Sequence, residues 1–377
     1  MKKILIVEPF YTGSHAQWIE GLRLNLRNFE TEVLSLEGRS WKWRMHGGAV
    51  TLADMFNRLD SAFDLVIASD MLDLPLFRSL VRTPTDTKYV IYFHENQLTY
   101  PWSPDDPDTG LQRDEHYAFI NYASALTADF CFFNSDYHRE SFFRCLRGFL
   151  KKFPDHNNLN TVDDIEMRSD TLHLSLDLKK FKTVRKPDGN FSGVLNILWN
   201  HRWEYDKNPE MFHRLLLEIE KRNIDFRLIL LGEKFLKTPE VLKAIYSRFP
   251  EKIIFDGYAE TFEEYASYLK TAHVLPVVNN QDFFGISVME AVCCGVIPLL
   301  PDRLAYPELY DISANGKFFY SSFEELISLI TDISLNFKNY DTSPLIDRAE
   351  SFDWCRMSSV YEKKFNEVMA RKTFREK

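Results

Sequence analysis

The chain has 377 residues, which is too long for one ordinary core; a domain size of roughly 50 to 200 residues predicts two domains. A hydrophobic content of 45% with 15% aromatic residues excludes general disorder. The net charge of −9 argues against bulk nucleic-acid binding, although the segments 139–152 and 179–186 are locally basic.

The N-terminal residues M-K-K-I-L-I-V-E mimic a secretory signal, but their apolar run has four residues where such signals need roughly 7–15. No apolar run approaches the ~20 residues of a membrane span. The cysteines have no metal-type spacing, and their odd count argues against a disulfide framework. We therefore expect a reduced, cytoplasmic setting without membrane association.

In the first half of the chain, short apolar runs alternate with longer amphipathic segments. The expected strands lie at 4–7, 32–36, 65–68, 89–93, 130–133 and 172–174. The expected helices lie near 15–28, 50–59, 73–82, 113–127 and 136–150. This alternation predicts a parallel sheet with helices on both faces.

The same alternation restarts after a basic, then Pro- and Gly-containing stretch. Strands are expected at 194–199, 226–231, 252–255, 273–278 and 296–300, and helices near 208–222, 239–248, 262–271, 286–294 and 323–335. The predicted fold is α/β, with two Rossmann-like, doubly wound parallel-sheet domains facing a cleft. We predict an N-terminal domain (1–180), a linker (181–193), a C-terminal domain (194–355) and a helix (356–377) that packs back across the domain boundary.

Residues 8–15, E-P-F-Y-T-G-S-H, join the first strand to the first helix. Gly13 lets the backbone approach a phosphate or sugar closely, and Ser14 is a natural N-cap. An ordinary strand–helix turn is the alternative.

Residues 93–97, F-H-E-N-Q, end the fourth strand of the first half. Consecutive polar groups are costly in a core and useful in a cleft. We predict that His94 contacts a sugar hydroxyl or phosphate, and that Glu95 and Asn96 join it in acceptor binding. A structural histidine is the alternative.

Arg202 and Lys207 lie in the short polar turn after the strand at 194–199. Loss of a nucleoside diphosphate from a sugar leaves negative charge on phosphate oxygens, which fixed cations stabilise. Cations on a solvated turn are the alternative, but Trp199 and Trp203 favour a partly desolvated setting.

Asp282 and Glu290 flank F-F-G, and a helix that begins near Gly285 directs its free N–H groups toward Asp282. Glu290 lies about one and a half turns into that helix, so the two carboxylates reach different parts of a ligand. Binding of sugar hydroxyls fits this spacing better than a glycosidase-type acid and base. Surface charge is the alternative.

Trp41, Trp43 and Arg44 lie in R-S-W-K-W-R-M-H-G-G, where rings alternate with cations. Such a pattern suits an unstacked base and its phosphates, and an interdomain packing patch is the alternative. The D-x-D sequence of Asp106 and Asp108 lies in a proline-rich loop. We interpret it as a solvated turn and predict no metal site.

These residues resemble the retaining, mannosyltransferase-rich glycosyltransferase family 4, which has the GT-B fold. The resemblance implies that Arg202 and Lys207 hold the donor diphosphate and that Glu290 binds the donor ribose. It also implies that the Gly13–Ser14 loop lies near the diphosphate. Asp282, with the backbone of Phe283, Phe284 and Gly285, would bind the hexose, although the family has the longer Glu where this chain has Asp282.

A narrower resemblance spans nearly the whole chain. It rests on E-P-F-Y-T-G-S-H, Y-F-H-E-N-Q-L-T-Y-P, W-N-H-R-W-E-Y-D-K-N-P and D-F-F-G, which are similar to the tRNA-queuosine α-mannosyltransferases. That resemblance implies transfer of mannose from GDP-mannose to the cyclopentenediol of queuosine in tRNA-Asp. It makes residues 1–180 the acceptor (tRNA) domain and residues 194–355 the nucleotide-sugar domain. It implies retention by front-face attack, with His94, Arg202, Lys207 and Asp282 as catalytic residues. Beyond this co-substrate, no cofactor and no metal are expected.

Two other functions stay open at the level of sequence. One is a family 4-like glycosyltransferase with another nucleotide-sugar, or with a glycan or lipid acceptor. The other is a non-catalytic protein that binds a nucleotide-sugar or tRNA, which the shorter Asp282 keeps open.

Overall fold

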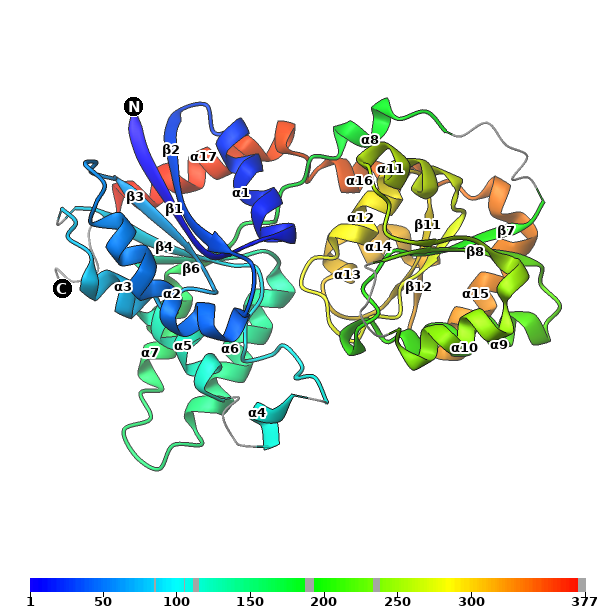
Figure 1. Ribbon diagram of the computed structural model, residues 1–377, viewed down its shortest axis with the longest axis horizontal. Helices are drawn as coiled ribbons and strands as arrows, with labels where there is room; N and C mark the ends of the chain where they lie inside the picture. Colours follow the sequence, from blue (N-terminus) through cyan, green and yellow to red (C-terminus); the bar gives the residue numbers. More distant parts are fainter. Residues whose placement is uncertain (85, 105, 111–114, 187–192, 233–237, 372–377) are drawn as a thin grey trace. The chain divides into compact units, whose positions relative to one another are not determined.

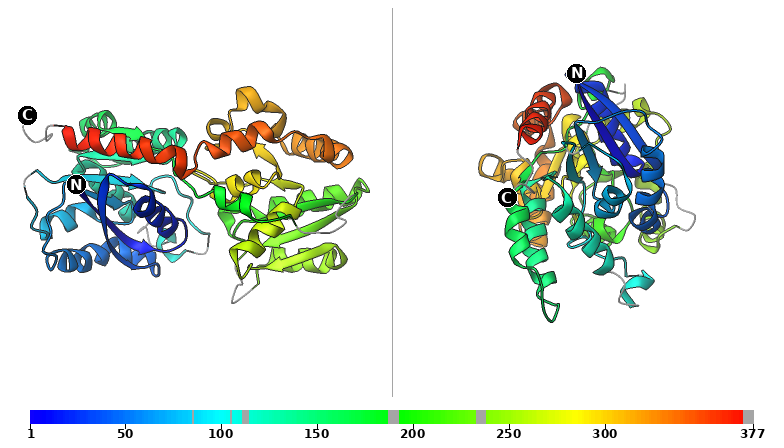
Figure 2. Two further views of the ribbon diagram at one scale, coloured as in Figure 1. Left: turned by 90° about the horizontal axis from the view of Figure 1, so that it is seen from above. Right: turned by 90° about the vertical axis from the view of Figure 1, so that its left-hand side faces the viewer.

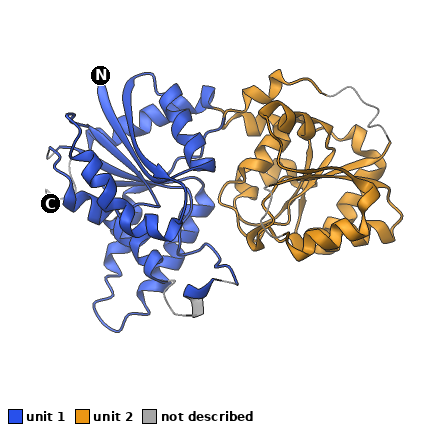
Figure 3. Cartoon of the chain, viewed as in Figure 1, with its two compact units in different colours: residues 1–176, 354–377 blue, residues 177–353 orange. Residues whose placement is uncertain are grey.

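The computed structural model describes residues 1–84, 86–104, 106–110, 115–186, 193–232 and 238–371. They form two compact units, one of residues 1–176 and 354–377 and one of residues 177–353 (Figure 3). The sequence predicts these boundaries after residues 180 and 355. Helix α8 (Lys179–Thr183) overlaps the start of the predicted linker 181–193, of which residues 187–192 lie outside the described residues.

In the described residues, the first unit has a parallel six-stranded sheet in the order β2-β1-β3-β4-β5-β6. Its strands are β1 (Lys2–Tyr11), β2 (Phe29–Glu37), β3 (Leu65–Ser69), β4 (Lys88–Phe93), β5 (Phe130–Phe133) and β6 (Ser169–Thr171). The chain runs from β1 to the edge strand β2 and then returns to β3 on the other side of β1. This reversal makes the carboxyl ends of β1 and β3 the topological switch point, where ligands of such sheets bind.

Helices cover both faces of this sheet (Figures 1 and 2). The helices of this unit are α1 (Gly13–Asn25), α2 (Trp41–Phe56), α3 (Leu74–Leu80), α4 (Pro107–Gly110), α5 (Glu115–Thr127), α6 (Asp136–Leu150), α7 (Asn160–Met167) and α17 (Trp354–Ala370), and α4 lies on a loop away from the sheet (Figure 1). Although α17 ends the chain, it packs in this unit, where Trp18 Nε1 donates to the Tyr361 hydroxyl at 3.0 Å. Residues 372–377 of the predicted C-terminal helix lie outside the described residues.

The second unit repeats this architecture, with a six-stranded sheet of described residues in the order β12-β11-β10-β7-β8-β9. Its strands are β7 (Leu195–Trp199), β8 (Phe226–Leu231), β9 (Ile253–Gly257), β10 (Val274–Pro276), β11 (Ile297–Pro301) and β12 (Phe319–Tyr320). The direction reverses between β7 and β10, so their carboxyl ends form the switch point of this unit.

Two groups of helices flank the second sheet, α9, α10 and α15 on one face and α11, α12 and α16 on the other (Figure 1). The α-helices not yet given bounds are α9 (Pro209–Lys221), α10 (Glu240–Arg248), α11 (Phe262–Thr271), α12 (Ile286–Cys293), α13 (Tyr306–Leu309), α14 (Ile312–Asn315), α15 (Phe323–Asn336) and α16 (Ser343–Glu350). The 3₁₀ turns are η1 (Tyr205–Lys207), η2 (Pro250–Lys252), η3 (Gly316–Phe318) and η4 (Phe337–Asn339).

Most expected elements are confirmed, and the exceptions have local causes. The strand expected at 172–174 lies at 169–171, because the polar edge strand S-D-T has no apolar run. The helix expected near 50–59 begins at Trp41, after Ser40 with φ +53°. The sequence did not predict several short elements, namely α4, α7, α8, α13, α14, α16 and β12. No helix in the described ranges combines the length and apolar character that a membrane crossing requires.

Candidate active site

The turn after β7 carries the predicted cations on a buried base. The rings of Trp199 and Trp203 stack at 4.7 Å between centroids, and both side chains are buried. Asn208, with φ +56°, ends η1 and accepts a hydrogen bond from Met211 N, which caps α9. Buried rings on one side and a capped helix on the other fix the backbone of this turn. The burial of the two rings confirms that the setting is partly desolvated.

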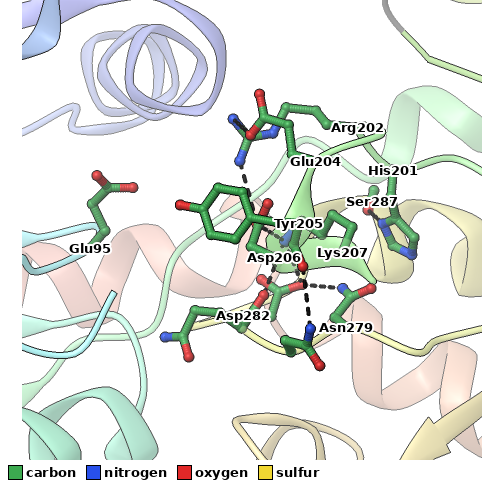
Figure 4. Close-up of polar contacts among 12 residues, drawn as sticks. Glu95, His201, Arg202, Glu204, Tyr205, Asp206, Lys207, Asn279, Asp282 and Ser287 are labelled. Atoms are coloured by element: carbon green, nitrogen blue, oxygen red, sulfur yellow. Dashed lines mark hydrogen bonds and ion pairs between the residues drawn. The ribbon is translucent and has the colours of Figure 1, made fainter. Parts of the chain in front are cut away.

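Lys207 and Arg202 come together around one carboxylate, Asp206 (Figure 4). Lys207 Nζ lies 3.2 Å from Asp206 Oδ2 and 3.6 Å from Asp282 Oδ2, and donates to the Gln281 carbonyl. Arg202 reaches Glu204 at 3.0 Å and Asp206 at 3.6 Å. The Arg202 side chain is 49% exposed and that of Lys207 only 14%. Arg202 is therefore the accessible cation and Lys207 the enclosed one.

Asp282 faces Lys207 from the segment after β10. Its Oδ2 accepts hydrogen bonds from Tyr306 Oη at 2.9 Å and Asn279 Nδ2 at 3.0 Å. Burial favours the protonated acid, but Lys207 and the Tyr306 hydrogen bond outweigh it and lower the pKa of Asp282. The side chain is therefore an ionised acceptor that is suited to a hydroxyl donor.

Gly285 is the N-cap of α12 and Glu290 lies within that helix, beyond the buried side chains of Phe283 and Phe284. Gly285 has φ +80°, and a Cβ there would lie 3.1 Å from Tyr306 Cε1. Glu290 accepts a hydrogen bond from the Tyr265 hydroxyl at 2.8 Å, and burial raises the pKa of Glu290. Asp282 and Glu290 thus have different partners.

His201 is a member of this site that the sequence analysis missed. Its ring is buried, and Nδ1 lies 3.0 Å from the Ser287 hydroxyl in the first turn of α12. Burial, and then the charge of Lys207, lower the pKa of His201 to about 3. Asn200 Nδ2 also donates to the Ser287 carbonyl, at 2.7 Å. A neutral imidazole therefore ties the cationic turn to the N-terminus of α12.

In the first unit, the switch point holds a buried ion pair of Glu8 and His15. Glu8 Oε2 lies 2.9 Å from His15 Nδ1, and Oε1 accepts from Ser69 Oγ and from Phe10 N. Burial opposes a charged ring, but Glu8 outweighs it and raises the pKa of His15 to about 9. This pair was not predicted from the sequence, although a Glu that directly follows an apolar strand pattern indicates a buried carboxylate with a partner.

The predicted loop residues Gly13 and Ser14 are exposed at the start of α1. Gly13 has φ +50°, with no described atom near the position of a Cβ. The N-cap is Thr12, so the prediction of Ser14 as the N-cap is wrong. The helix begins at Gly13, two residues before the start that an N-cap at Ser14 would give.

His94 lies at the end of β4, with its ring 4.2 Å from that of His15 and 4.8 Å from that of Trp18. Asp70 accepts from His94 N at 2.8 Å, and burial raises the pKa of Asp70 to about 8. Glu95 is half-buried and accepts from Gln97 Nε2 at 3.2 Å.

Asn96 is fully buried, and its side-chain oxygen accepts from the backbone N–H groups of Leu98 and Thr99. The structure therefore places its side chain inside the turn after β4. Its role in acceptor binding stays a prediction.

Trp41, Trp43 and Arg44 lie in the first turn of α2, in two different environments. The Trp41 ring packs 5.1 Å from that of Tyr117 and 6.0 Å from that of Trp102. Trp43 is 63% exposed and covers Gly47, where a Cβ would lie 2.6 Å from the ring. Arg44 Nε donates to the Glu37 carbonyl at 3.0 Å.

The D-x-D pair has a structural partner. Lys42 Nζ lies 2.6 Å from Asp106 and 2.5 Å from Asp108, whose side chains are 16% and 14% exposed. The interpretation as a solvated turn is therefore wrong, because the two carboxylates are partly buried against a lysine of α2. Across the described ranges, no group of three or more His, Cys, Asp or Glu could hold a metal ion.

The chain is similar in sequence to known families along most of its length. Residues 3–176 match the family described as tRNA-queuosine alpha-mannosyltransferase N-terminal, and residues 181–339 match glycosyl transferases group 1. The chain is 33% identical to the tRNA-queuosine alpha-mannosyltransferase of Drosophila melanogaster over 314 residues. This match covers 81% of each of the two chains. The chain is also 23% identical to the GDP-mannose:cellobiosyl-diphosphopolyprenol alpha-mannosyltransferase of Xanthomonas oryzae pv. oryzae. That match extends over 178 residues and covers 46% of this chain and 47% of the relative.

The fold is shared with solved structures at low sequence identity. The sucrose-phosphate synthase of Thermosynechococcus elongatus superimposes with a TM-score of 0.72 at 12% identity, over 98% of this chain and all of that one. The glycosyltransferase of Rickettsia africae superimposes with a TM-score of 0.66 at 13% identity, over 98% of this chain and 99% of that one. Together with the two parallel sheets, these likenesses confirm the predicted GT-B fold.

Proposed function

The chain belongs to the tRNA-queuosine alpha-mannosyltransferase family, and from this premise we propose that it transfers mannose from GDP-mannose to the cyclopentenediol of queuosine in tRNA-Asp, with retention at the anomeric carbon. The observation that carries the proposal is the 33% identity with the Drosophila enzyme, which extends through both units. The coarser assignment is a glycosyltransferase, which the match of residues 181–339 supports independently.

Two observations support a GDP-mannose donor. The relative from Xanthomonas is named for that donor. The site of the second unit also offers cations for a nucleoside diphosphate, Arg202 and Lys207, and Lys207 lies 3.6 Å from Asp282, which precedes the N-cap of α12. In the proposal, the pyrophosphate displaces the carboxylate partners of Arg202 and the sugar hydroxyls donate to Asp282.

The reaction then breaks the bond between mannose C1 and the diphosphate oxygen and forms a bond from C1 to a queuosine hydroxyl oxygen on the same face. The proton of that hydroxyl moves to the leaving phosphate. Arg202 and Lys207 stabilise the charge that develops on the diphosphate, and no protein nucleophile takes part. His94 contacts the reacting sugar, Glu290 binds the ribose, and side-chain cations replace a metal ion.

The acceptor is proposed to meet the first unit. Trp43 offers an exposed ring next to Arg44, and stacking on such a ring suits a base that leaves its stack. Glu95, which is half-buried at the end of β4, is suited to accept from a diol hydroxyl.

The test incubates the purified protein with GDP-mannose and queuosine-containing tRNA, digests the RNA and measures hexosyl-queuosine by mass spectrometry. We expect the peak with the wild-type chain and with Arg227→Ala, an exposed arginine of β8, and its loss with Arg202→Ala. An α-linked product by NMR would support retention. Turnover with UDP-sugars but not GDP-mannose would overturn the donor, and transfer to a glycan or lipid but not tRNA would overturn the acceptor.

A further inference from the structure

We propose that the buried Glu8–His15 pair is a positioning device for His94, which keeps the His94 imidazole neutral and fixed in orientation. His94 then meets the hexose as an uncharged hydrogen-bonding group. The inference rests on the proposed function in one respect only, the contact of His94 with the donor sugar.

Three elements bring this cluster together at the switch point of the first sheet. Glu8 comes from β1, His15 from the first turn of α1, and His94 from the end of β4. The His15 ring lies on that of His94 at 4.2 Å with an angle of 31° between the planes, and Trp18 meets His94 edge-on at 84°. Within the described residues, His94 Nε2 has no hydrogen-bond partner. Packing against His15 and Trp18 therefore sets the ring orientation.

Glu8 fixes His15 more firmly than a surface pair could. It is fully buried, and its two oxygens accept from three groups, His15, Ser69 and the backbone of Phe10. A buried carboxylate of this kind needs a cation, because an unpaired charge in a core is costly. His15 supplies that cation and cannot turn away without leaving Glu8 unpaired.

A charged His15 then acts on His94 through space. The titratable groups that face His94 are His15 from α1, Asp70 from the turn after β3, Tyr92 from β4 and His138 from α6. Burial, and then the charges of His15 and His138, hold the pKa of His94 well below its usual range. The cation of the pair is therefore His15, and His94 stays neutral. Arg202 and Lys207, and not His94, then stabilise the negative charge of the leaving diphosphate.

NMR of the ring nitrogens in the full wild-type chain tests the protonation states without any turnover. We expect His15 to stay protonated at pH 7.5 and His94 to stay neutral at pH 5. Titration of His94 near its ordinary pKa, or a neutral His15 at pH 7.5, would overturn the inference. Because this readout needs no mannosyl transfer, it separates failure of the inference from failure of the proposed function.

Kinetics of His15→Gln tests the consequence for the reaction. Glutamine keeps a hydrogen bond to Glu8 but removes the charge, so His94 becomes easier to protonate. The acid limb of kcat/KM for GDP-mannose should move to higher pH, so that activity falls about tenfold more at pH 6 than at pH 8. An equal loss at every pH would mark a merely structural role and overturn the inference. His213→Gln on α9 is the matched control and should leave the profile unchanged.

Discussion

Two histidines follow the first strands of the two sheets, and they meet opposite charges. His15 follows β1 and pairs with Glu8, which raises the pKa of His15 to about 9 against the effect of burial. His201 follows β7, where burial and Lys207 lower its pKa to about 3. Both rings are buried. The fold thus sets the place of each histidine, and the nearest charge decides its protonation state.

The difference matches the work that each unit is proposed to do. In the second unit, Arg202 and Lys207 are the cations for a diphosphate, and a charged His201 would add an unpaired cation beside them. In the first unit, the cation of His15 is balanced within the protein by Glu8 and is not available for a ligand phosphate. In the proposed reaction the two switch points therefore have separate roles, charge neutralisation in one and orientation of an uncharged ring in the other.

The largest expected effect comes from removing the cations of the second unit. Arg202→Ala and Lys207→Ala should each lower kcat for mannosyl transfer by about 10²–10³-fold, because each removes a fixed charge from the leaving diphosphate. Lys207→Ala should also destabilise the fold by roughly 3–5 kcal/mol, since it leaves Asp206 and Asp282 without their enclosed partner. Arg202→Ala should leave the stability nearly unchanged. Urea denaturation and steady-state kinetics give the two readouts.

Lys221→Ala is the control for that pair of variants. Lys221 ends α9 with a 69% exposed side chain paired to Glu218, so its loss should change neither activity nor stability measurably. If Lys207→Ala kept full activity, the proposed role of the enclosed cation would be wrong, whatever its effect on stability.

The pH dependence of stability sharpens the comparison of the histidines. His15 has a folded pKa above its unfolded value, so its contribution is present below about pH 6.5 and is lost as the pH rises through about 9. His201 has a depressed folded pKa, so its contribution is present above about pH 6.5 and is lost as the pH falls through about 3. Asp70, with its pKa raised by burial to about 8, changes in the same direction as His15.

Urea denaturation from pH 4 to pH 9 measures these opposite slopes. His15→Gln should flatten the alkaline loss of stability and His201→Gln the acidic loss, each by on the order of 1–3 kcal/mol. Equal changes at both ends of the range in either variant would show that the mutation acts through packing and not through charge.

The sequence predicted the strand–helix order well, because buried parallel strands such as β5 and residues 89–93 of β4 read as unbroken apolar runs. It also predicted that Arg202, Lys207 and Asp282 belong to one site, through a family pattern. It missed partners that only the fold brings near, such as Tyr306 on Asp282, which lie 24 positions apart. From the sequence, Trp41 and Trp43 had the same predicted role. Their positions on helix α2 place the Trp41 ring in packing contact and leave the Trp43 ring exposed.

The two tryptophans of α2 offer a comparison within the first unit. Trp43→Ala should weaken binding of queuosine-containing tRNA by about tenfold without loss of stability, because stacking on an exposed ring contributes roughly 1–3 kcal/mol. Trp41→Ala should instead destabilise the fold by about 3 kcal/mol, since its ring packs against Trp102 and Tyr117. Fluorescence anisotropy with labelled tRNA and urea denaturation separate the two effects. Unchanged tRNA affinity in Trp43→Ala would remove this ring from the acceptor site.

The smallest expected effects come from two glycines that begin helices at the two switch points. Gly13 has φ +50° and Gly285 has φ +80°, so alanine at either position should cost about 1 kcal/mol in backbone strain. At Gly285 the new Cβ would also lie 3.1 Å from Tyr306 Cε1, whereas no described atom lies within 4 Å of a Cβ at Gly13. Gly285→Ala should therefore destabilise the fold more than Gly13→Ala in urea denaturation.

Gly285→Ala should also weaken GDP-mannose binding, because Tyr306 is the ring whose hydroxyl donates to Asp282. Equal donor affinity in the two variants would mean that Tyr306 does not transmit the crowding to Asp282.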